Sequence, residues 1–85
     1  NYPNPFNPTT KIRFTNDRSS NVKVTVYALT GEKVATIMNK SVKAGAYDVS
    51  WNGRNTNGKV VPTGMYLYDI ESEGRRLQGK MLFLK

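Results

Sequence analysis

The chain of 85 residues contains no cysteine and no histidine. Without histidine it lacks the most common general base, and without cysteine it lacks a thiolate nucleophile. These two residue types are also the commonest zinc ligands. The sequence therefore predicts a protein that is not an enzyme and that holds neither a metal nor another cofactor. Because no disulfide can form, the redox compartment is left open.

Long apolar runs and blocks of like charge are also missing. No apolar stretch approaches the roughly 20 residues that a membrane-spanning helix needs. The net charge is +7, but the basic residues are dispersed and only Arg75 and Arg76 are neighbours. Nucleic-acid-binding domains usually gather their positive charge on one stripe or face. The pattern predicts a solvated basic surface and no nucleic-acid partner.

Alternation of apolar and polar residues is the main local signal. In residues 21–29, Val22, Val24 and Val26 fall on one face of a strand and polar residues fall on the other. No stretch has a helical period. The spacing of Val34 and Ile37 departs from strict alternation and predicts a β-bulge. Further short strands are expected at residues 12–14, 34–38, 47–51, 65–70 and 77–84.

Short strands between turn signals predict an all-β fold, an immunoglobulin-like antiparallel β-sandwich of about seven strands. The alternative is a five-stranded barrel of the oligonucleotide-binding type, which needs fewer strand-turn units than this sequence supplies. Residues 1–10 are rich in proline and asparagine and are expected to form a linker or a lead-in strand. Residues 11–85 are expected to form the sandwich domain.

The single tryptophan, Trp51, is expected to anchor the core, and Tyr66 is expected to hydrogen-bond upstream backbone as a corner tyrosine. The loop of residues 52–58 has the rhythm of a calcium loop but lacks carboxylates, so we expect its asparagines to stabilise turns. The predicted core comprises Val24, Val26, Val49, Trp51, Tyr66 and Tyr68.

The last two predicted strands are apolar on both faces. If Tyr66 and Tyr68 face the core, the opposite face exposes Met65, Leu67, Leu82 and Leu84. An exposed apolar patch usually marks an interface, which makes these residues a possible docking face for a partner or for the preceding domain. The alternative is that the proline-rich head or the twist of the strands covers them.

Several short motifs occur in a fixed order along the chain. They are the head Pro3-Asn4-Pro5, the spaced set Tyr27, Gly31 and Val34, the turn Trp51-Asn52-Gly53, the pair Gly64 and Tyr66, and a lysine-bracketed end from Lys80 to Lys85. With these motifs the chain resembles the type A C-terminal sorting domain of the type IX secretion system in Bacteroidetes. Through that family it also resembles the immunoglobulin-like domain of flagellar hook-capping proteins.

The resemblance implies a non-catalytic domain that targets a larger cargo protein for type IX secretion across the outer membrane and for attachment to the cell surface. The implied partners are the secretion machinery, a sortase, the upstream cargo domain of the same chain and anionic lipopolysaccharide. The implied location is the outer-membrane surface or the extracellular space, reached through the periplasm. The expected recognition residues are Pro3, Asn4, Pro5, Gly64, Tyr66, Lys80 and Lys85.

A second interpretation is a structural or glycan-binding accessory β-sandwich on a surface polysaccharide hydrolase. Under both interpretations we expect the chain to be part of a longer polypeptide, since it starts without methionine or an apolar leader.

Overall fold

The computed structural model describes residues 9–85, and within this range every regular element is a strand. The described residues form six antiparallel strands. Their bounds are β1 (Thr10–Asn16), β2 (Ser20–Ala28), β3 (Lys33–Val42), β4 (Gly45–Trp51), β5 (Gly64–Ser72) and β6 (Arg75–Phe83). The predicted all-β class is confirmed.

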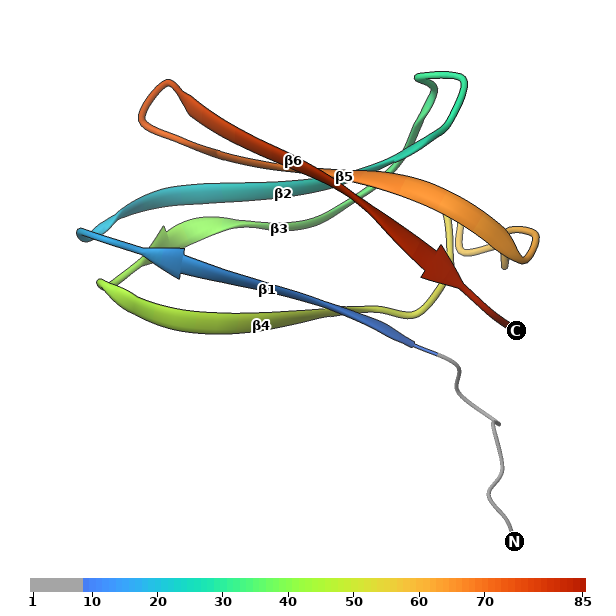
Figure 1. Cartoon of the computed structure of the whole chain (residues 1–85), viewed down its shortest axis with the longest axis horizontal. Coiled ribbons are helices and arrows are strands. Elements are labelled where there is room, and N and C mark those ends of the chain that lie inside the picture. The colour runs from blue at the N-terminus through green and yellow to red at the C-terminus, as the bar shows by residue number, and fades with distance from the viewer. Residues whose placement is uncertain (1–8) are drawn as a thin grey trace, which may run out of the picture.

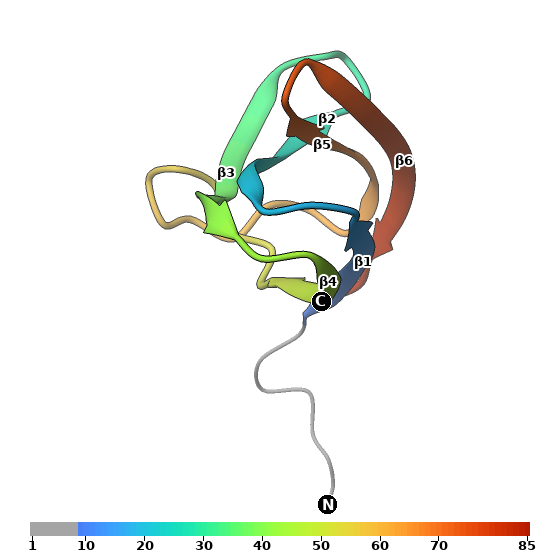
Figure 2. The same cartoon turned by 90° about the vertical axis from the view of Figure 1, so that its left-hand side faces the viewer.

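The strands form two sheets that pack face to face. One sheet pairs β1 with β4, and the other has the order β3-β2-β5-β6. Figure 1 shows the two layers, and Figure 2 shows β1 and β4 lying beneath the curved larger sheet. This arrangement confirms the predicted immunoglobulin-like sandwich.

The strand count is six, one fewer than expected. The long connection between β4 and β5 contributes only an isolated bridge between Arg54 and Val60. Pro62 follows closely, and because proline has no N–H it cannot donate to a strand ladder. The connection therefore stays a loop that returns the chain from one sheet to the other.

Strand β2 is central in the larger sheet, because it pairs with β3 on one side and with β5 on the other. Val22, Val24 and Val26 point into the sandwich and are at most 1% exposed. Burying a valine side chain contributes roughly 1.5–3 kcal/mol, so these three positions are a large part of the hydrophobic stabilisation. Thr25 lies on the opposite face between two flanking strands and is also buried.

The pairing of β2 with β3 is irregular at two places. Thr25 pairs with Thr36 and Val24 with Met38, so Ile37 has no partner, and a second shift leaves Val34 without one. These are the two residues whose spacing departs from alternation in the sequence. The predicted bulge is confirmed, and the extra residues increase the local twist of this edge of the sheet.

The β5–β6 hairpin is regular and tightly closed. Its turn consists of Glu73 and Gly74, both with positive φ (50° and 78°), as a two-residue type I′ turn requires. Ser72 pairs with Arg75, and the register continues without a shift to the pair of Gly64 and Phe83. The turn thereby fixes which side chains of β6 face the core.

The smaller sheet carries one charged pair directly across its two strands. Arg13 lies opposite Asp48, and its Nε donates a hydrogen bond of 2.8 Å to Oδ1. This hydrogen bond and the adjacent positive charge hold the pKa of the Asp48 carboxyl below its usual value. Because the pair is exposed, it contributes more to the register of β1 and β4 than to stability.

The centre of the core is an aromatic cluster of Trp51, Tyr66 and Phe83. The ring centroid of Trp51 lies 5.1 Å from that of Tyr66 and 5.2 Å from that of Phe83. Trp51 ends β4 in the smaller sheet, whereas the other two rings come from β5 and β6. The cluster thus joins the two layers through one continuous contact.

Gly53 makes this cluster possible. It has a φ of 76°, and a Cβ built on it would overlap the ring of Phe83. Only a residue without a side chain lets the chain turn after Trp51 while the Phe83 ring lies against the backbone. Gly58 in the same loop has a similar φ of 83° but open space around it.

These two glycines form a matched test of the packing. Gly58→Ala should cost about 1–2 kcal/mol, the penalty of a left-handed conformation. Gly53→Ala carries the same penalty and must also displace Phe83, so it should cost at least about 3 kcal/mol. Denaturant unfolding of both variants measures the difference, and equal losses of stability would show that Phe83 does not pack on Gly53.

Candidate interaction surface

Tyr66 is buried, and its hydroxyl is used inside the domain. The phenol donates a hydrogen bond of 2.6 Å to the carbonyl of Pro62. Burial raises the pKa of the Tyr66 phenol above its ordinary value. The residue therefore fixes the corner that leads from the long loop into β5.

The other predicted core residues occupy different depths. Val24 and Val26 are fully buried and Trp51 is 1% exposed, while Val49 and Tyr68 are half-buried against the same cluster. A Cβ on Gly79 would overlap the Tyr68 ring, so this ring lies directly on the backbone of β6. Tyr68 thus covers a place where β6 has no side chain of its own.

The loop that follows Trp51 is held by its own backbone and side chains. The indole Nε1 donates to the carbonyl of Arg54 at 3.1 Å, and the Asn55 Oδ1 accepts from the backbone N–H groups of Asn57 and Lys59. Arg54 donates through Nη1 to the carbonyl of Gly58. These contacts match the expected turn role of the loop asparagines.

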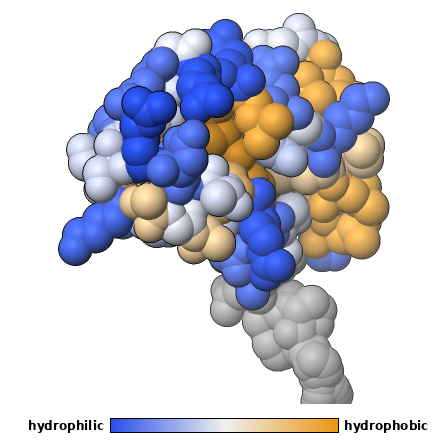
Figure 3. Space-filling view, turned by 60° about the vertical axis from the view of Figure 1, so that its left-hand side comes forward, coloured by the Kyte–Doolittle hydropathy of each residue, from blue (hydrophilic) through white to orange (hydrophobic). Residues whose placement is uncertain are grey.

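An apolar patch lies on the outer face of β5 and β6. Met65 is directly opposite Leu82 in the ladder, and their exposed fractions are 42% and 50%. Leu84, just beyond β6, is 59% exposed, whereas Leu67 is half-buried beside Lys80. Seen from one side, the surface is mostly hydrophilic with hydrophobic side chains gathered in separate areas (Figure 3). The docking role of this patch remains a prediction.

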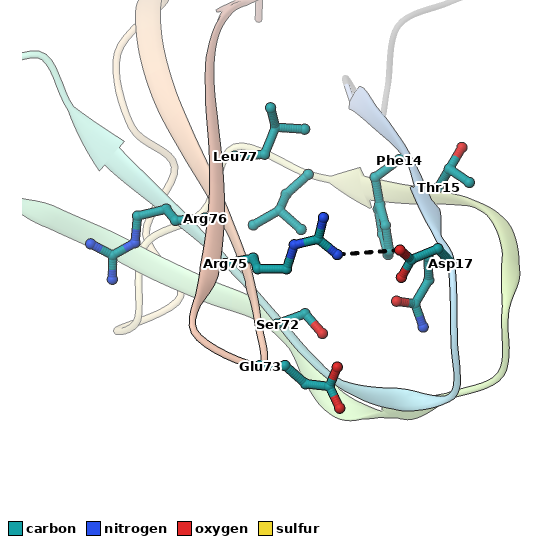
Figure 4. A pocket seen from close by; sticks show the side chains of 10 residues that line it. Phe14, Thr15, Asp17, Ser72, Glu73, Arg75, Arg76 and Leu77 are labelled. Atoms are coloured by element: carbon teal, nitrogen blue, oxygen red, sulfur yellow. Dashed lines mark hydrogen bonds and ion pairs between the residues drawn. The ribbon is translucent and has the colours of Figure 1, made fainter.

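A groove lies between the end of β1 and the beginning of β6. It encloses about 310 Å³ and is lined by Phe14, Ile70 and Leu77 together with polar side chains. Figure 4 shows Arg75 reaching across it toward Asp17, and the two side chains form an ion pair of 3.2 Å. The groove is therefore apolar at its base and charged at its mouth.

Asp69 is a buried carboxylate on the outer face of the larger sheet, only 4% exposed. Its Oδ1 lies 3.2 Å from the Nε of Arg76, but no protein group in the described range forms a hydrogen bond with this atom. Arg76 also contacts Glu71 at 3.5 Å. Arg76 therefore forms ion pairs with two carboxylates of β5 at once.

The residues expected to act in recognition can be placed only in part, and their recognition role stays a prediction. Pro3, Asn4 and Pro5 lie outside the described residues. Gly64 and Tyr66 lie at the start of β5, where Tyr66 is buried, while Lys80 is exposed in the middle of β6. Lys85 is near Gly64, because its backbone N–H donates to the hydroxyl of Thr63.

Two kinds of feature are absent from residues 9–85. No group of three or more acidic, histidine or cysteine side chains is placed to hold a metal ion. In the same range no helix is long and apolar enough to cross a membrane.

The two sheets and the aromatic cluster between them define an immunoglobulin-like β-sandwich module. The family model of the FlgD Ig-like domain matches residues 3–75, and the chain belongs to this family. The chain is also similar to a crystal structure of FlgD from P. aeruginosa, with a TM-score of 0.71 and 28% sequence identity. That similarity covers 89% of this chain and 59% of the FlgD chain. No curated protein matches the chain significantly.

These comparisons overturn the type IX assignment. The matching family is that of the FlgD immunoglobulin-like domain, and no type IX sorting family is matched. The expected sorting function, the secretion machinery, sortase, cargo and lipopolysaccharide as partners, and the location at the outer-membrane surface or outside the cell are therefore wrong. The glycan-binding accessory module is also unsupported. FlgD proteins are structural and not enzymatic, which is consistent with the expectation that this chain is not an enzyme.

The motifs that suggested the type IX family have structural roles in this sandwich, which is the physical reason why the assignment was wrong. Trp51 and Gly53 allow the ring contact with Phe83 that connects the two sheets. Tyr66 fixes the chain before β5 through its hydrogen bond to the Pro62 carbonyl. Any sandwich of this design needs such residues, whatever it binds. The family model matches a long stretch of the chain, residues 3–75, and does not rest on any one of these short motifs.

The hydrogen bond of Tyr66 has a matched partner in Tyr47. Both hydroxyls donate over 2.6 Å to the backbone carbonyl four residues earlier, but only the Tyr66 bond is partly buried. Tyr66→Phe should cost about 1 kcal/mol, because it leaves a partly buried carbonyl without its donor, and Tyr47→Phe should cost less than about 0.5 kcal/mol. Thermal and denaturant unfolding measure both, and a larger loss at Tyr47 would contradict the corner role.

The raised pKa of Tyr66 also predicts a pH dependence. Below the ordinary pKa of 10.0 the phenol is neutral in the folded and the unfolded chain. Above it, the unfolded chain loses the proton more readily, so stability falls as pH rises toward the folded-state pKa. Between about pH 9 and about pH 11 the wild type should lose more stability than Tyr66→Phe. Parallel pH profiles of the two proteins would contradict the burial of an ionisable phenol.

Proposed function

We propose that this chain is a non-catalytic structural module of a flagellar hook-capping protein of the FlgD type. The observation that carries the proposal is the family match over residues 3–75, together with the similarity to FlgD at a TM-score of 0.71. The chain spans 59% of that FlgD chain, so the role of the complete protein belongs to the proposal.

The chemistry of the domain supports a structural role without catalysis. Its buried tyrosine hydroxyl is committed to Pro62, and its buried carboxylate, Asp69, is compensated by Arg76. The sequence also lacks histidine and cysteine, which are the most common general base and the thiolate nucleophile of enzymes. The Tyr66 hydroxyl and the Asp69 carboxylate therefore have structural partners within the domain.

The division of the chain is part of this proposal. Residues 11–85 would form the rigid module, and residues 1–10 would connect it to other parts of the protein. β1 begins at Thr10, beside the end of β6, where the Thr10 hydroxyl donates to the carbonyl of Leu82. The connection would thus enter next to the apolar patch of Met65, Leu82 and Leu84.

In this role the sandwich would act as a rigid domain, and its apolar patch of Met65, Leu82 and Leu84 would pack against another protein surface of the hook cap. Exposed apolar area on a small domain is typical of such contacts. The joint of Trp51 with Phe83 would hold β6, and with it Leu82, in a fixed position relative to the smaller sheet.

A domain replacement tests the proposed role. In a P. aeruginosa strain without FlgD, a chimera carries this chain in place of the matching immunoglobulin-like part of FlgD. We expect hooks and motility to be restored at least partly, as measured by electron microscopy and swimming assays. A chimera that is stable and soluble in the cell but supports no hooks would contradict the proposal.

The same assay tests the apolar patch with a matched control. Met65→Lys combined with Leu82→Lys places charge in the patch and should reduce hook formation strongly. Leu29→Lys changes a leucine that is 60% exposed elsewhere and should have little effect. Both proteins should retain their unfolding midpoints within a few degrees, because surface substitutions change stability by about 0.5 kcal/mol or less. Equal hook formation by the two variants would contradict docking through this patch.

A further inference from the structure

The larger sheet has two edge strands, β3 and β6, and within residues 9–85 β3 is the better protected of the two. The register of β3 is interrupted by its unpaired residues Val34 and Ile37. The backbone N–H and the hydroxyl of Thr56 both donate to the carbonyl of Val34, at 3.0 and 3.1 Å. At the other end of β3, the side chain of Asn16 donates to the carbonyl of Val42. Bulges and covering loops of this kind keep an edge from pairing with other chains.

The outer edge of β6 has little such protection. Its ladder with β5 runs through nine residue pairs without a shift, and no described strand pairs with its other side. Residues that flank a two-residue turn exchange hydrogen bonds, and bonded pairs then alternate along the ladder. The N–H and C=O groups of Arg76, Gln78 and Lys80 therefore point away from β5. Leu82 belongs to the same series, and its carbonyl accepts from Thr10.

The groove with the apolar base and the charged mouth lies beside the exposed part of this edge. β1 approaches β6 at the hydrogen bond between Thr10 and Leu82, whereas near Arg75 the two strands leave the groove shown in Figure 4. Phe14 and Ile70 at its base are buried, but Leu77 is 58% exposed. A strand added to β6 would place every second side chain over this groove, because side chains alternate between the two faces.

The charge of β6 indicates what such a strand would carry. Residues 75–85 contain four basic residues and no acidic one. Arg75 pairs with Asp17 and Arg76 with Asp69, whereas Lys80 forms no ion pair with any residue in the range 9–85. Lys80 is therefore the cation that an added strand would meet without a competing carboxylate.

The same charges disfavour a second copy of this chain as the occupant. Antiparallel pairing of two β6 strands about Gln78 would set Arg76 of one copy opposite Lys80 of the other. Like charges directly opposite in a ladder are destabilising. The net charge of +7 adds repulsion between copies.

We propose that the β6 edge from Arg76 to Lys80 binds an extended segment of another protein by strand addition. The segment carries an acidic side chain beside Lys80 and apolar side chains over the groove of Phe14, Ile70 and Leu77. Backbone hydrogen bonds supply most of the affinity, and the charge and the groove supply selectivity. This site stands on the geometry of β6 and is independent of the hook-cap role.

Amide hydrogen exchange tests the site directly, with a short capped peptide of alternating valine and glutamate as the probe. In the free domain the amides of Arg76, Gln78 and Lys80 should exchange fast, while those of Leu77 and Gly79 are protected by β5. Millimolar peptide should slow exchange at the first three amides. A peptide of the same length with alternating valine and lysine is the control and should protect them less. No protection by the glutamate peptide would overturn the proposal.

Two substitutions at one position separate backbone pairing from side-chain contact. Gln78→Pro removes the outward N–H but no bond to β5, and proline is tolerated on the free side of an edge strand. It should weaken peptide binding at least tenfold, whereas Gln78→Ala should bind as the wild type does. Equal binding by Gln78→Pro would overturn strand addition, provided that its unfolding midpoint shows a folded domain.

Lys80→Glu tests the charge and does not depend on the proline variant being folded. Replacing an attractive exposed ion pair by a repulsive one should weaken binding of the glutamate peptide about fivefold, in keeping with the energy of surface ion pairs. The preference between the glutamate and lysine peptides should reverse. An unchanged preference would overturn the acidic assignment of the partner.

Discussion

The contact of Trp51 with Phe83 is the constraint on which the structure depends. A two-stranded sheet is marginal alone, and here it gains stability by packing on a larger one. Trp51 brings the end of β4 against β6, and the turn at Gly53 lets the two rings approach within 5.2 Å. The indole N–H finds its acceptor at Arg54, so burial of the ring leaves no polar group unpaired. One residue thereby joins the layers and shapes the following loop.

The contact of Trp51 with Phe83 also determines where the two proposed contact surfaces lie. Phe83 is buried at the end of β6, so the end of the strand is fixed near β1, while its start near Arg75 is separated from β1 by the groove. The regular hairpin directs Met65 and Leu82 outward and leaves the backbone of residues 76–80 unpaired on one side. An apolar patch and an open edge therefore lie side by side on the same strand. Both proposed contacts follow from how the core holds β6.

Much of the fold was predictable because its signals are local. The alternation around Val24 identified a strand, which the structure places in the interior of the larger sheet. The spacing of Val34 and Ile37 identified the irregular pairing of β3. The surface was less accessible to sequence reasoning. Lys80 was singled out through the family resemblance, but only the register shows that it lies on an edge strand. Asp69 gives no sign in the sequence that it is buried and paired with Arg76. Such facts depend on pairings between distant strands.

Function was the least predictable property. The residues that suggested a secretion signal, such as Gly53 and Tyr66, are those that any sandwich with this joint requires, and they therefore report architecture. The membership in the FlgD Ig-like family came from the match over residues 3–75. The contacts proposed for this chain lie on exposed positions of β5 and β6, where the fold imposes few demands on the sequence.

A double-mutant cycle between the two sheets tests the central claim most directly. Trp51→Phe, Phe83→Leu and the double variant are unfolded with denaturant, and the coupling energy is taken from the three losses of stability. If the two rings join the layers, the coupling should be about 1 kcal/mol. Additive losses, with a coupling near zero, would show that the sheets are held together elsewhere and would contradict the account.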